Sequence, residues 1–217
     1  DIRQVSGQIL EQTQRVSQIV QTLVSYAHSG QNHQQRRGNI EVATPEPVDL
    51  HASIQEAISL LQLSHKNSQI EFRNLCPESH QVSGNRQKLQ QVFINLLKNA
   101  ADASDSGGTV TIHSSVSTHT VTVHFEDQGH GIPKAIQEKL FEPFFTTKEA
   151  GKGTGLGLAL TWNIIEEHFG SIQVISPLDS KSHSGSDFII SLPRYEQEPL
   201  DITQYEEPHL EHQGNTA

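Results

Sequence analysis

The sequence contains no methionine, one tryptophan and one cysteine, Cys76, and only 6% of its 217 residues are aromatic. A lone cysteine excludes an internal disulfide and a zinc site made of several thiolates. It also fits a reducing compartment such as the cytosol. The thirteen histidines are scattered, and no pair has the His-Glu-x-x-His spacing of a zinc helix. Hydrophobic residues make up 34% of the chain, so we expect part of its length to be linker or tail.

Long apolar runs and basic clusters are also missing. No run approaches the roughly 20 residues of a membrane-spanning helix, and no signal peptide is visible. The 15 Lys and Arg residues stand against 25 Asp and Glu, a formal net charge of −10, and Arg36-Arg37 is the longest basic block. A nucleic-acid partner is therefore disfavoured. We expect a cytoplasmic piece of a longer protein, which leaves room for a membrane anchor elsewhere in the parent.

Residues 1–28 carry a seven-residue hydrophobic repeat. Its two series are Ile2, Ile9, Val16 and Leu23, and Val5, Gln12, Ile19 and Tyr26. This is the a/d pattern of a coiled coil or a four-helix bundle. A single helix cannot bury such a seam alone, so we expect a homodimer through residues 1–28. Packing against the chain's own globular part is the alternative.

The remaining chain divides by composition and periodicity. Residues 29–47 are predicted to be a linker, and the acidic, polar residues 195–217 a disordered tail. Between them, helices are predicted at 52–63, 85–104, 133–140 and 154–169, and strands at 48–50, 69–75, 109–116, 119–126, 171–176 and 187–192. This order lacks regular strand–helix–strand alternation. It predicts an α+β fold over residues 48–194, a two-layer sandwich with helices on one face of a mixed or antiparallel sheet.

The predicted helix 85–104 carries a polar stripe next to its apolar face. Asn95, Asn99 and Asp102 follow one another at steps of three or four residues and so share one side. Two asparagine carbonyls one turn apart can hold a hard cation such as Mg²⁺ together with phosphate oxygens. Lys98 lies beside them and can offset phosphate charge. A solvated helix face is the alternative interpretation.

Asp127 ends an alternating strand and is followed by Gly129 and Gly131. A carboxylate at a strand end can point into a cleft and accept a hydrogen bond from a purine amine, a charge-assisted bond of about 1.5–3 kcal/mol. The glycines let the backbone turn tightly and approach a ring closely. An ordinary Asp-Gly turn is the alternative.

Gly153, Gly155 and Gly157 come directly before a strongly predicted helix. Backbone N–H groups at a helix start bind phosphate when no side chain is in the way. No strand precedes these glycines, and Lys152 is followed by glycine instead of Ser or Thr, so neither the Rossmann nor the Walker pattern fits. A flexible linker is the alternative.

Phe141, Phe144 and Phe145 lie between the two glycine segments and predict a lid that folds onto a ligand. Thr146, Thr147 and Lys148 then offer hydroxyls and a positive charge to phosphates. Aromatic side chains that simply fill the core are the alternative.

In this order, the four segments resemble the catalytic ATP-binding domain of sensor histidine kinases. Asn95–Ala100 resembles the N box of that family, Asp127–Ile132 its first glycine box, 141–145 its F box, and Gly153–Leu158 its second glycine box. The resemblance covers about residues 48–193 and implies the Bergerat ATP-binding sandwich. Residues 1–28 resemble the second helix of the kinase dimerisation module, and the short lid resembles the nitrogen-regulation branch.

The resemblance also implies roles for individual residues. Asn99 would ligate Mg²⁺, with Asn95 as a candidate second ligand. Asp127 would recognise adenine, and Asn95, Lys98 and Asn99 would serve catalysis. Residues implied in ATP binding are Asn95, Asn99, Asp102, Asp127, Gly129, Gly131, Ile132, Phe144, Thr147, Lys148, Gly153, Thr154, Gly155, Leu156, Gly157 and Leu158. The family transfers the γ-phosphoryl group of ATP to a histidine on a separate acceptor helix, and then to an aspartate of a response regulator receiver domain.

Some features depart from the family pattern. The acceptor histidine followed by Glu or Asp is absent, and His28 lies near the end of its predicted helix, so we expect no self-phosphorylation. Gln128 and His130 are unusual residues in the first glycine box. ATPases of the same fold carry a glutamate base four residues before the metal-binding asparagine, whereas Asn95 cannot accept a proton at neutral pH. A histidine kinase is therefore favoured over a weak ATPase, an anti-sigma-type serine kinase or a non-catalytic ATP sensor or scaffold.

Overall fold

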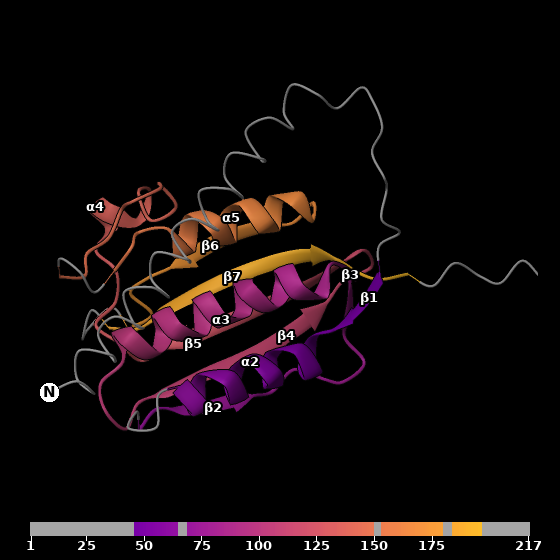
Figure 1. The fold of residues 1–217 in the computed structure, drawn as a ribbon, viewed down its shortest axis with the longest axis horizontal. Coiled ribbons are helices and arrows are strands. Elements are labelled where there is room, and N and C mark those ends of the chain that lie inside the picture. The colour runs from indigo at the N-terminus through magenta and orange to yellow at the C-terminus, as the bar shows by residue number, and fades with distance from the viewer. Residues whose placement is uncertain (1–45, 65–68, 150–152, 180–183, 197–217) are drawn as a thin grey trace, which may run out of the picture.

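The computed structural model describes residues 46–64, 69–149, 153–179 and 184–196. The predictions for residues 1–28, for most of the linker and for most of the tail lie outside these ranges. Among the described residues, no helix combines the length and the apolar character that a bilayer crossing requires. Helices α2 (Leu50–Ser64), α3 (Arg86–Ala103) and α5 (Gly157–Glu167) lie over one face of a five-stranded sheet (Figure 1).

The sheet has the strand order β2–β4–β5–β7–β6. Its strands are β2 (Glu71–Asn74), β4 (Thr109–Val116), β5 (Thr120–Asp127), β6 (Ser171–Ile175) and β7 (Ser186–Pro193). Strands β2 and β4 are parallel, and the other pairs are antiparallel. The prediction of a mixed sheet covered by helices on one face is therefore confirmed. A separate two-stranded sheet joins β1 (Glu46–Asp49) to β3 (Gln81–Gly84).

The core lies between the helices and the sheet. Six residues of α3 are buried, and Phe93 stacks on Phe125 of β5 with ring centroids 6.0 Å apart. On β5, Val121, Val123 and Phe125 are fully buried, because alternate residues of a strand face the same side. Burial of each such side chain contributes about 1.5–3 kcal/mol. This packing fixes α3 across β5, so the polar stripe of α3 has a defined position relative to the end of β5.

Several element boundaries differ from those predicted. Helix α2 begins at Leu50, because the Asp49 carboxylate caps it by accepting a 2.9 Å hydrogen bond from the Ala52 N–H. Strand β3 was not predicted, since Val82 is its only apolar residue. Helix α4 is confined to Lys134–Gln137 and is followed by tighter turns. Helix α5 begins at Gly157 and not at 154, because Gly155 has φ +65° and cannot continue a helix.

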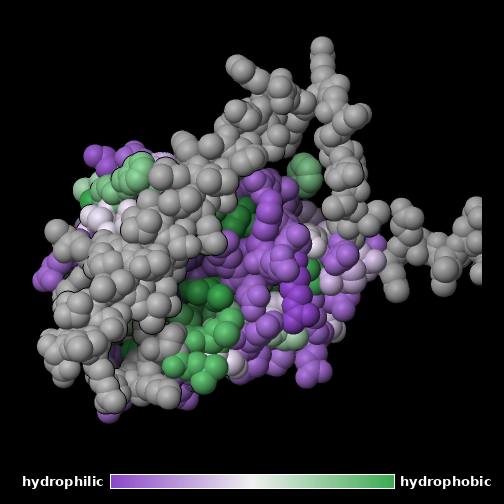
Figure 2. Space-filling model, in the orientation of Figure 1, coloured by the Kyte–Doolittle hydropathy of each residue, from purple (hydrophilic) through white to green (hydrophobic). Residues whose placement is uncertain are grey.

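The domain also extends slightly beyond the predicted range 48–194. At one end β1 starts at Glu46, within the predicted linker. At the other end the Tyr195 N–H donates a 3.1 Å hydrogen bond to the Gln81 carbonyl. On the helical face, Figure 2 shows a hydrophobic patch over α2, where Leu63 is 69% exposed.

Candidate nucleotide-binding site

Helix α3 carries three polar side chains that contact two different segments. The helix starts at a capped end, where the Asn85 side chain accepts a 3.0 Å hydrogen bond from the Lys88 N–H. Along the predicted stripe, Asn95 contacts the start of α5, while Asn99 and Asp102 contact Lys148 of the lid. The stripe is therefore engaged with other segments and is not a simple solvated face.

The Asn95 amide links α3 to the second glycine segment. Its Nδ2 donates to the Gly157 carbonyl at 3.2 Å and lies 3.5 Å from Thr161 Oγ1. The two predicted asparagines therefore have different partners, because Asn99 Oδ1 accepts from Lys148 Nζ at 3.2 Å. Lys98, between them in sequence, has an exposed side chain.

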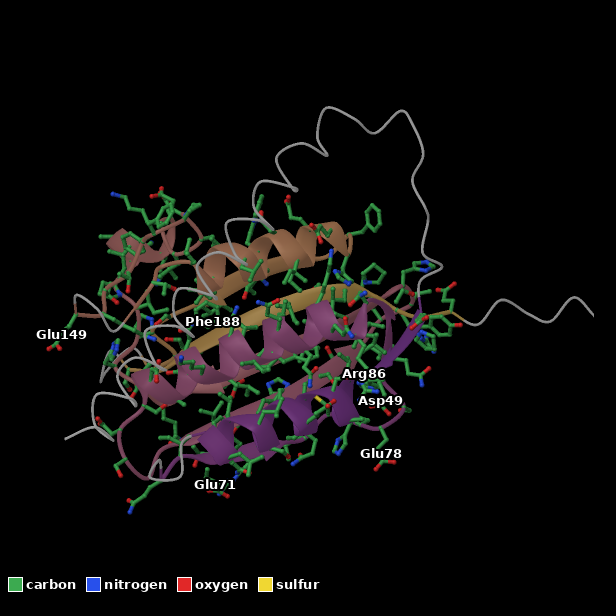
Figure 3. All side chains as sticks on the ribbon, viewed as in Figure 1. Asp49, Glu71, Glu78, Arg86, Glu149 and Phe188 are labelled. Atoms are coloured by element: carbon green, nitrogen blue, oxygen red, sulfur yellow. The ribbon has the colours of Figure 1, made fainter. Side chains whose placement is uncertain are left out.

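The lid end of the site lies at the carboxyl end of α3. Lys148 Nζ also pairs with Asp102 Oδ2 at 2.7 Å, and both side chains are 36% exposed. Figure 3 shows Glu149, next to Lys148, at the opposite end of the molecule from Arg86, the first residue of α3. An amide oxygen, a carboxylate and an ammonium thus gather at one end of the helical layer, where charged phosphates and a cation would find both signs of charge.

Asp127 is almost completely buried, with 3% of its surface exposed, at the end of β5. Burial raises the pKa of this carboxyl group, while hydrogen bonds from the Gly129 and Ser186 backbones lower it in part. The Gly129 N–H lies 2.8 Å from Asp127 Oδ1. A carboxylate so placed can accept a hydrogen bond from a ligand amine that enters the site.

The first glycine segment runs directly against the end of α3. A Cβ on Gly129 would collide with the Ala103 carbonyl, and the His130 N–H donates to that same carbonyl at 3.3 Å. Gly131 has φ +72°, a conformation that favours glycine. Ile132 is half-buried and donates its N–H to Ser176 Oγ at 2.7 Å. These contacts hold the segment beside Asp127.

Three further residues, which no sequence motif identifies, contact the first glycine segment and the end of β5. The Gly185 N–H donates to the Gly129 carbonyl at 2.7 Å, and Ser176 Oγ donates to the Gly185 carbonyl at 2.9 Å. Ser186 is 2% exposed and lies opposite Asp127 in the β5–β7 register. Their only local signal is a cluster of small residues at strand ends, and strand order alone brings them to Asp127.

The lid and the second glycine segment are joined at Phe144 and Gly155. The Phe144 N–H donates to the Gly155 carbonyl at 2.8 Å, both residues have positive φ, and a Cβ on Gly155 would collide with the Phe144 carbonyl. Phe144 is 62% exposed, whereas Phe141 packs against the core. One aromatic residue of the lid therefore fills the core, as in the alternative interpretation, and Phe144 stays open to solvent.

Helix α5 begins at Gly157 with Leu156 at its N-cap position, and no side chain caps it. The first N–H groups of such a helix have no intrahelical partner and favour an anion. Upstream, a Cβ on Gly153 would lie 2.5 Å from Thr146 Oγ1, and the Leu156 N–H lies 3.4 Å from Thr154 Oγ1. Leu158 is half-buried beside the core, and Thr147 is exposed.

Comparison with known proteins places this geometry in a family. Residues 84–196 match the model of the histidine kinase-, DNA gyrase B- and HSP90-like ATPases. Sporulation kinase A of Bacillus subtilis is 37% identical over 187 residues, which are 86% of this chain and 28% of that protein. The histidine-protein kinase AtoS of Escherichia coli is 32% identical, over 77% of this chain and 26% of that protein. The chain thus spans about a quarter of these relatives' length.

Solved structures agree with this assignment. The mycobacterial sensor histidine kinase MprB superposes with a TM-score of 0.63 at 29% identity, over 69% of this chain and 97% of the other. The catalytic domain of histidine kinase ThkA gives 0.61 at 33% identity, over 69% and 95%. Membership in the nitrogen-regulation branch stays a prediction. The chain belongs to the histidine kinase-, DNA gyrase B- and HSP90-like ATPase family and carries the catalytic ATP-binding domain of a sensor histidine kinase.

Proposed function

We propose that this chain binds Mg²⁺-ATP and transfers the γ-phosphoryl group to a histidine on an acceptor helix outside the described domain. A response regulator receiver domain then takes the phosphoryl group on an aspartate. The observation that carries the proposal is the buried Asp127 carboxylate, which is hydrogen-bonded to Gly129. In the same domain, Asn99 near the end of α3 is hydrogen-bonded to Lys148 of the lid. Adenine would donate its amine to Asp127, and the phosphates would extend toward the start of α5.

The chemistry of Asn99 fits a magnesium ligand. Its Oδ1 already accepts from a cation, the Lys148 ammonium, at 3.2 Å. Neutral amide oxygens and carboxylates such as Asp102 are the oxygen ligands that hard cations take. Mg²⁺ bound at Asn99 would neutralise the negative charge that develops on the transferred phosphoryl group. Lys148, released from Asn99 and Asp102, would be free to contact phosphate oxygens.

Asn95 favours phosphoryl transfer over hydrolysis. Its amide cannot activate a water by accepting a proton, and its Nδ2 is occupied by the Gly157 carbonyl. The residue therefore positions the phosphate-binding end of α5 against α3. Transfer then depends on how the acceptor imidazole and the phosphate are oriented, because the imidazole is itself the nucleophile.

The partners follow from the same proposal. Residues 1–28 would form the second dimerisation helix and a homodimer. The chain between them and β1 would be the linker, and the chain beyond Glu196 a tail in a cytoplasmic protein. The histidine kinase ThkA, crystallised with the response regulator TrrA, is 28% identical to this chain with a TM-score of 0.65 over 86% of it and 49% of the other chain. That complex supports a response regulator as the partner of this chain.

The test mixes the 217-residue chain with γ-labelled ATP, Mg²⁺ and a histidine-bearing dimerisation module from a histidine kinase. We expect label on the module as acid-labile, base-stable phosphohistidine, and none on the chain alone. Release of inorganic phosphate without a labelled acceptor would identify an ATPase, and acid-stable phosphoserine on an added anti-sigma-factor antagonist would identify a serine kinase. Asn99→Ala should abolish transfer, while Asp105→Asn, an exposed change beyond α3, should preserve it.

A further inference from the structure

The face of the sheet that points away from the helices carries a cluster of imidazole and carboxylate side chains. His113 of β4 and His124 of β5 are directly opposite in register, and Glu126 lies two residues after His124 on the same side of β5. Within the described ranges, these three residues form a group whose ligand atoms all lie within 4.8 Å of one another. All three are half-buried, so the group is partly shielded from water but reachable.

The distances suit a tetrahedral metal ion. His113 Nε2 and Glu126 Oε1 are hydrogen-bonded at 3.0 Å, a contact that an ion bound between them would replace. Two ligand atoms on a tetrahedral zinc, each about 2.0–2.1 Å from the ion, are separated by about 3.3 Å. The His113 and His124 rings stack face to face with centroids 4.4 Å apart and planes inclined by 11°, so both imidazoles lie next to the Glu126 carboxylate and one ring has to turn about its side-chain bonds for both lone pairs to meet at one ion.

A fourth residue orients the second imidazole. The His124 Nδ1–H donates to Asp187 Oδ2 at 2.8 Å, which leaves the lone pair of His124 on Nε2. A carboxylate that holds the other ring nitrogen is the usual support of a metal-bound histidine. Asp187 is 7% exposed at its side chain, and its Oδ1 is buried without a hydrogen-bond partner among the described residues.

The charges at this position also call for a cation. Glu126 and Asp187 are directly opposite in the β5–β7 register, and like charges directly opposite destabilise a sheet. A buried carboxylate oxygen without a donor adds a further cost. A divalent ion beside both side chains would offset the repulsion. A water bound to that ion would donate the hydrogen bond that Asp187 Oδ1 lacks.

We propose that His113, His124 and Glu126 form a binding site for Zn²⁺ or a similar first-row divalent ion, with Asp187 orienting His124. Two imidazoles and one carboxylate, with one position left to water, are a ligand set that zinc accepts. The site is separate from the nucleotide site. Glu126 and Asp127 are consecutive, so their side chains leave β5 on opposite faces.

The test uses the whole chain, freed of metal by chelation and without nucleotide. Zn²⁺ is titrated in competition with a chromogenic chelator, and Co²⁺ is titrated while its visible d–d absorption is recorded. We expect the wild-type chain to bind one ion that His124→Gln and Glu126→Gln do not bind, with the intense Co²⁺ spectrum of a tetrahedral site. Asp187→Asn should weaken the affinity by about 10–100-fold.

The matched control is His119→Gln, at the tip of the same β4–β5 hairpin, where the side chain is 80% exposed. It removes one of the thirteen histidines without touching the cluster and should keep the affinity. Far-ultraviolet circular dichroism verifies that each variant folds. If His124→Gln does not fold, the metal affinity of Glu126→Gln decides the question. Equal stoichiometry and affinity in the wild type and in a folded cluster variant would overturn the proposal, as would the absence of binding to the wild type.

Discussion

Lys148 Nζ lies 3.2 Å from Asn99 Oδ1 and bridges from there to Asp102 Oδ2 at 2.7 Å. The lid is thereby tied to the carboxyl end of α3 through a single ammonium group. Because Asn99 is the proposed magnesium ligand, the same contact links the lid to the position where phosphate charge has to be balanced.

Lys148→Met tests this link. Loss of a charged hydrogen bond to phosphate should weaken binding of a non-hydrolysable ATP analogue by about 1.5–3 kcal/mol, at least tenfold. The thermal stability should change little, because the ion pair with Asp102 is one-third exposed and contributes at most about 1 kcal/mol. Calorimetric titration measures the affinity. Lys139→Met, an exposed lysine after α4, is the control, and equal affinity of the two variants would refute a phosphate contact.

Asp127→Asn should separate binding from stability. The amide can still accept the Gly129 N–H, now at 2.8 Å from Oδ1, but it no longer offers a full negative charge to adenine. We expect the affinity for the ATP analogue to fall by about 1.5–3 kcal/mol. The free energy of unfolding should not fall, because a desolvated charge is removed. Chemical denaturation and calorimetry of this variant, compared with Asp105→Asn, check both parts; a destabilised variant with intact affinity contradicts them.

The raised pKa of Asp127 predicts a pH dependence. Its folded-state pKa lies above the ordinary value of 3.8 because of burial. The folded protein therefore binds this proton before the unfolded chain does. The contribution of Asp127 to the free energy of unfolding rises as pH falls through the folded pKa toward the unfolded one. Affinity for ATP falls over the same range, since the protonated carboxyl is uncharged and accepts only a weaker hydrogen bond from the adenine amine.

Denaturation of the wild type and of Asp127→Asn at a series of pH values isolates the pH-dependent contribution of Asp127 to the free energy of unfolding. The stability difference between the two proteins should shrink as the pH falls below neutrality toward the unfolded pKa of aspartate. A difference that stays constant, or grows in the acid range, would show that burial does not raise this pKa.

Gly155→Ala should disturb the lid more than Gly157→Ala. Gly155 has φ +65°, which costs an alanine about 1–2 kcal/mol, and its new Cβ would collide with the Phe144 carbonyl. A Cβ on Gly157 would lie 3.6 Å from Asn95 Oδ1, an ordinary contact. Proteolysis of the lid and thermal melting report the effect. If the two variants resist proteolysis equally and melt at the same temperature, the contact between Phe144 and Gly155 does not hold the lid in place.

The parts of this protein that could be predicted from sequence are those with local signals. The Asn85 cap, the buried stripe of α3 and the alternation in β5 each arise within a few residues, so periodicity and capping rules identify them. The predicted start of α5 lies three residues too early. Leu156 continues the four-residue spacing of Leu160 and Ile164, but Gly155, with φ +65°, cannot be helical.

The parts that could not be predicted depend on strand order. Ser186 reaches Asp127, and Asp187 reaches Glu126, only because β7 pairs with β5 across about 60 residues of chain. The histidines of β4 and β5 appear scattered in sequence, yet the hairpin register sets His113 opposite His124. Local patterns carry no information about such pairs. The residues around Asp127 and the residues of the imidazole cluster therefore come together only in the folded chain.

The most direct test of the central claim is a crystal structure of this chain with Mg²⁺ and a non-hydrolysable ATP analogue. The account predicts the adenine amine within hydrogen-bond distance of Asp127, Mg²⁺ on Asn99 Oδ1, and the γ-phosphate between Lys148 and the start of α5. A nucleotide bound elsewhere, or an adenine whose amine makes no contact with Asp127, would contradict it.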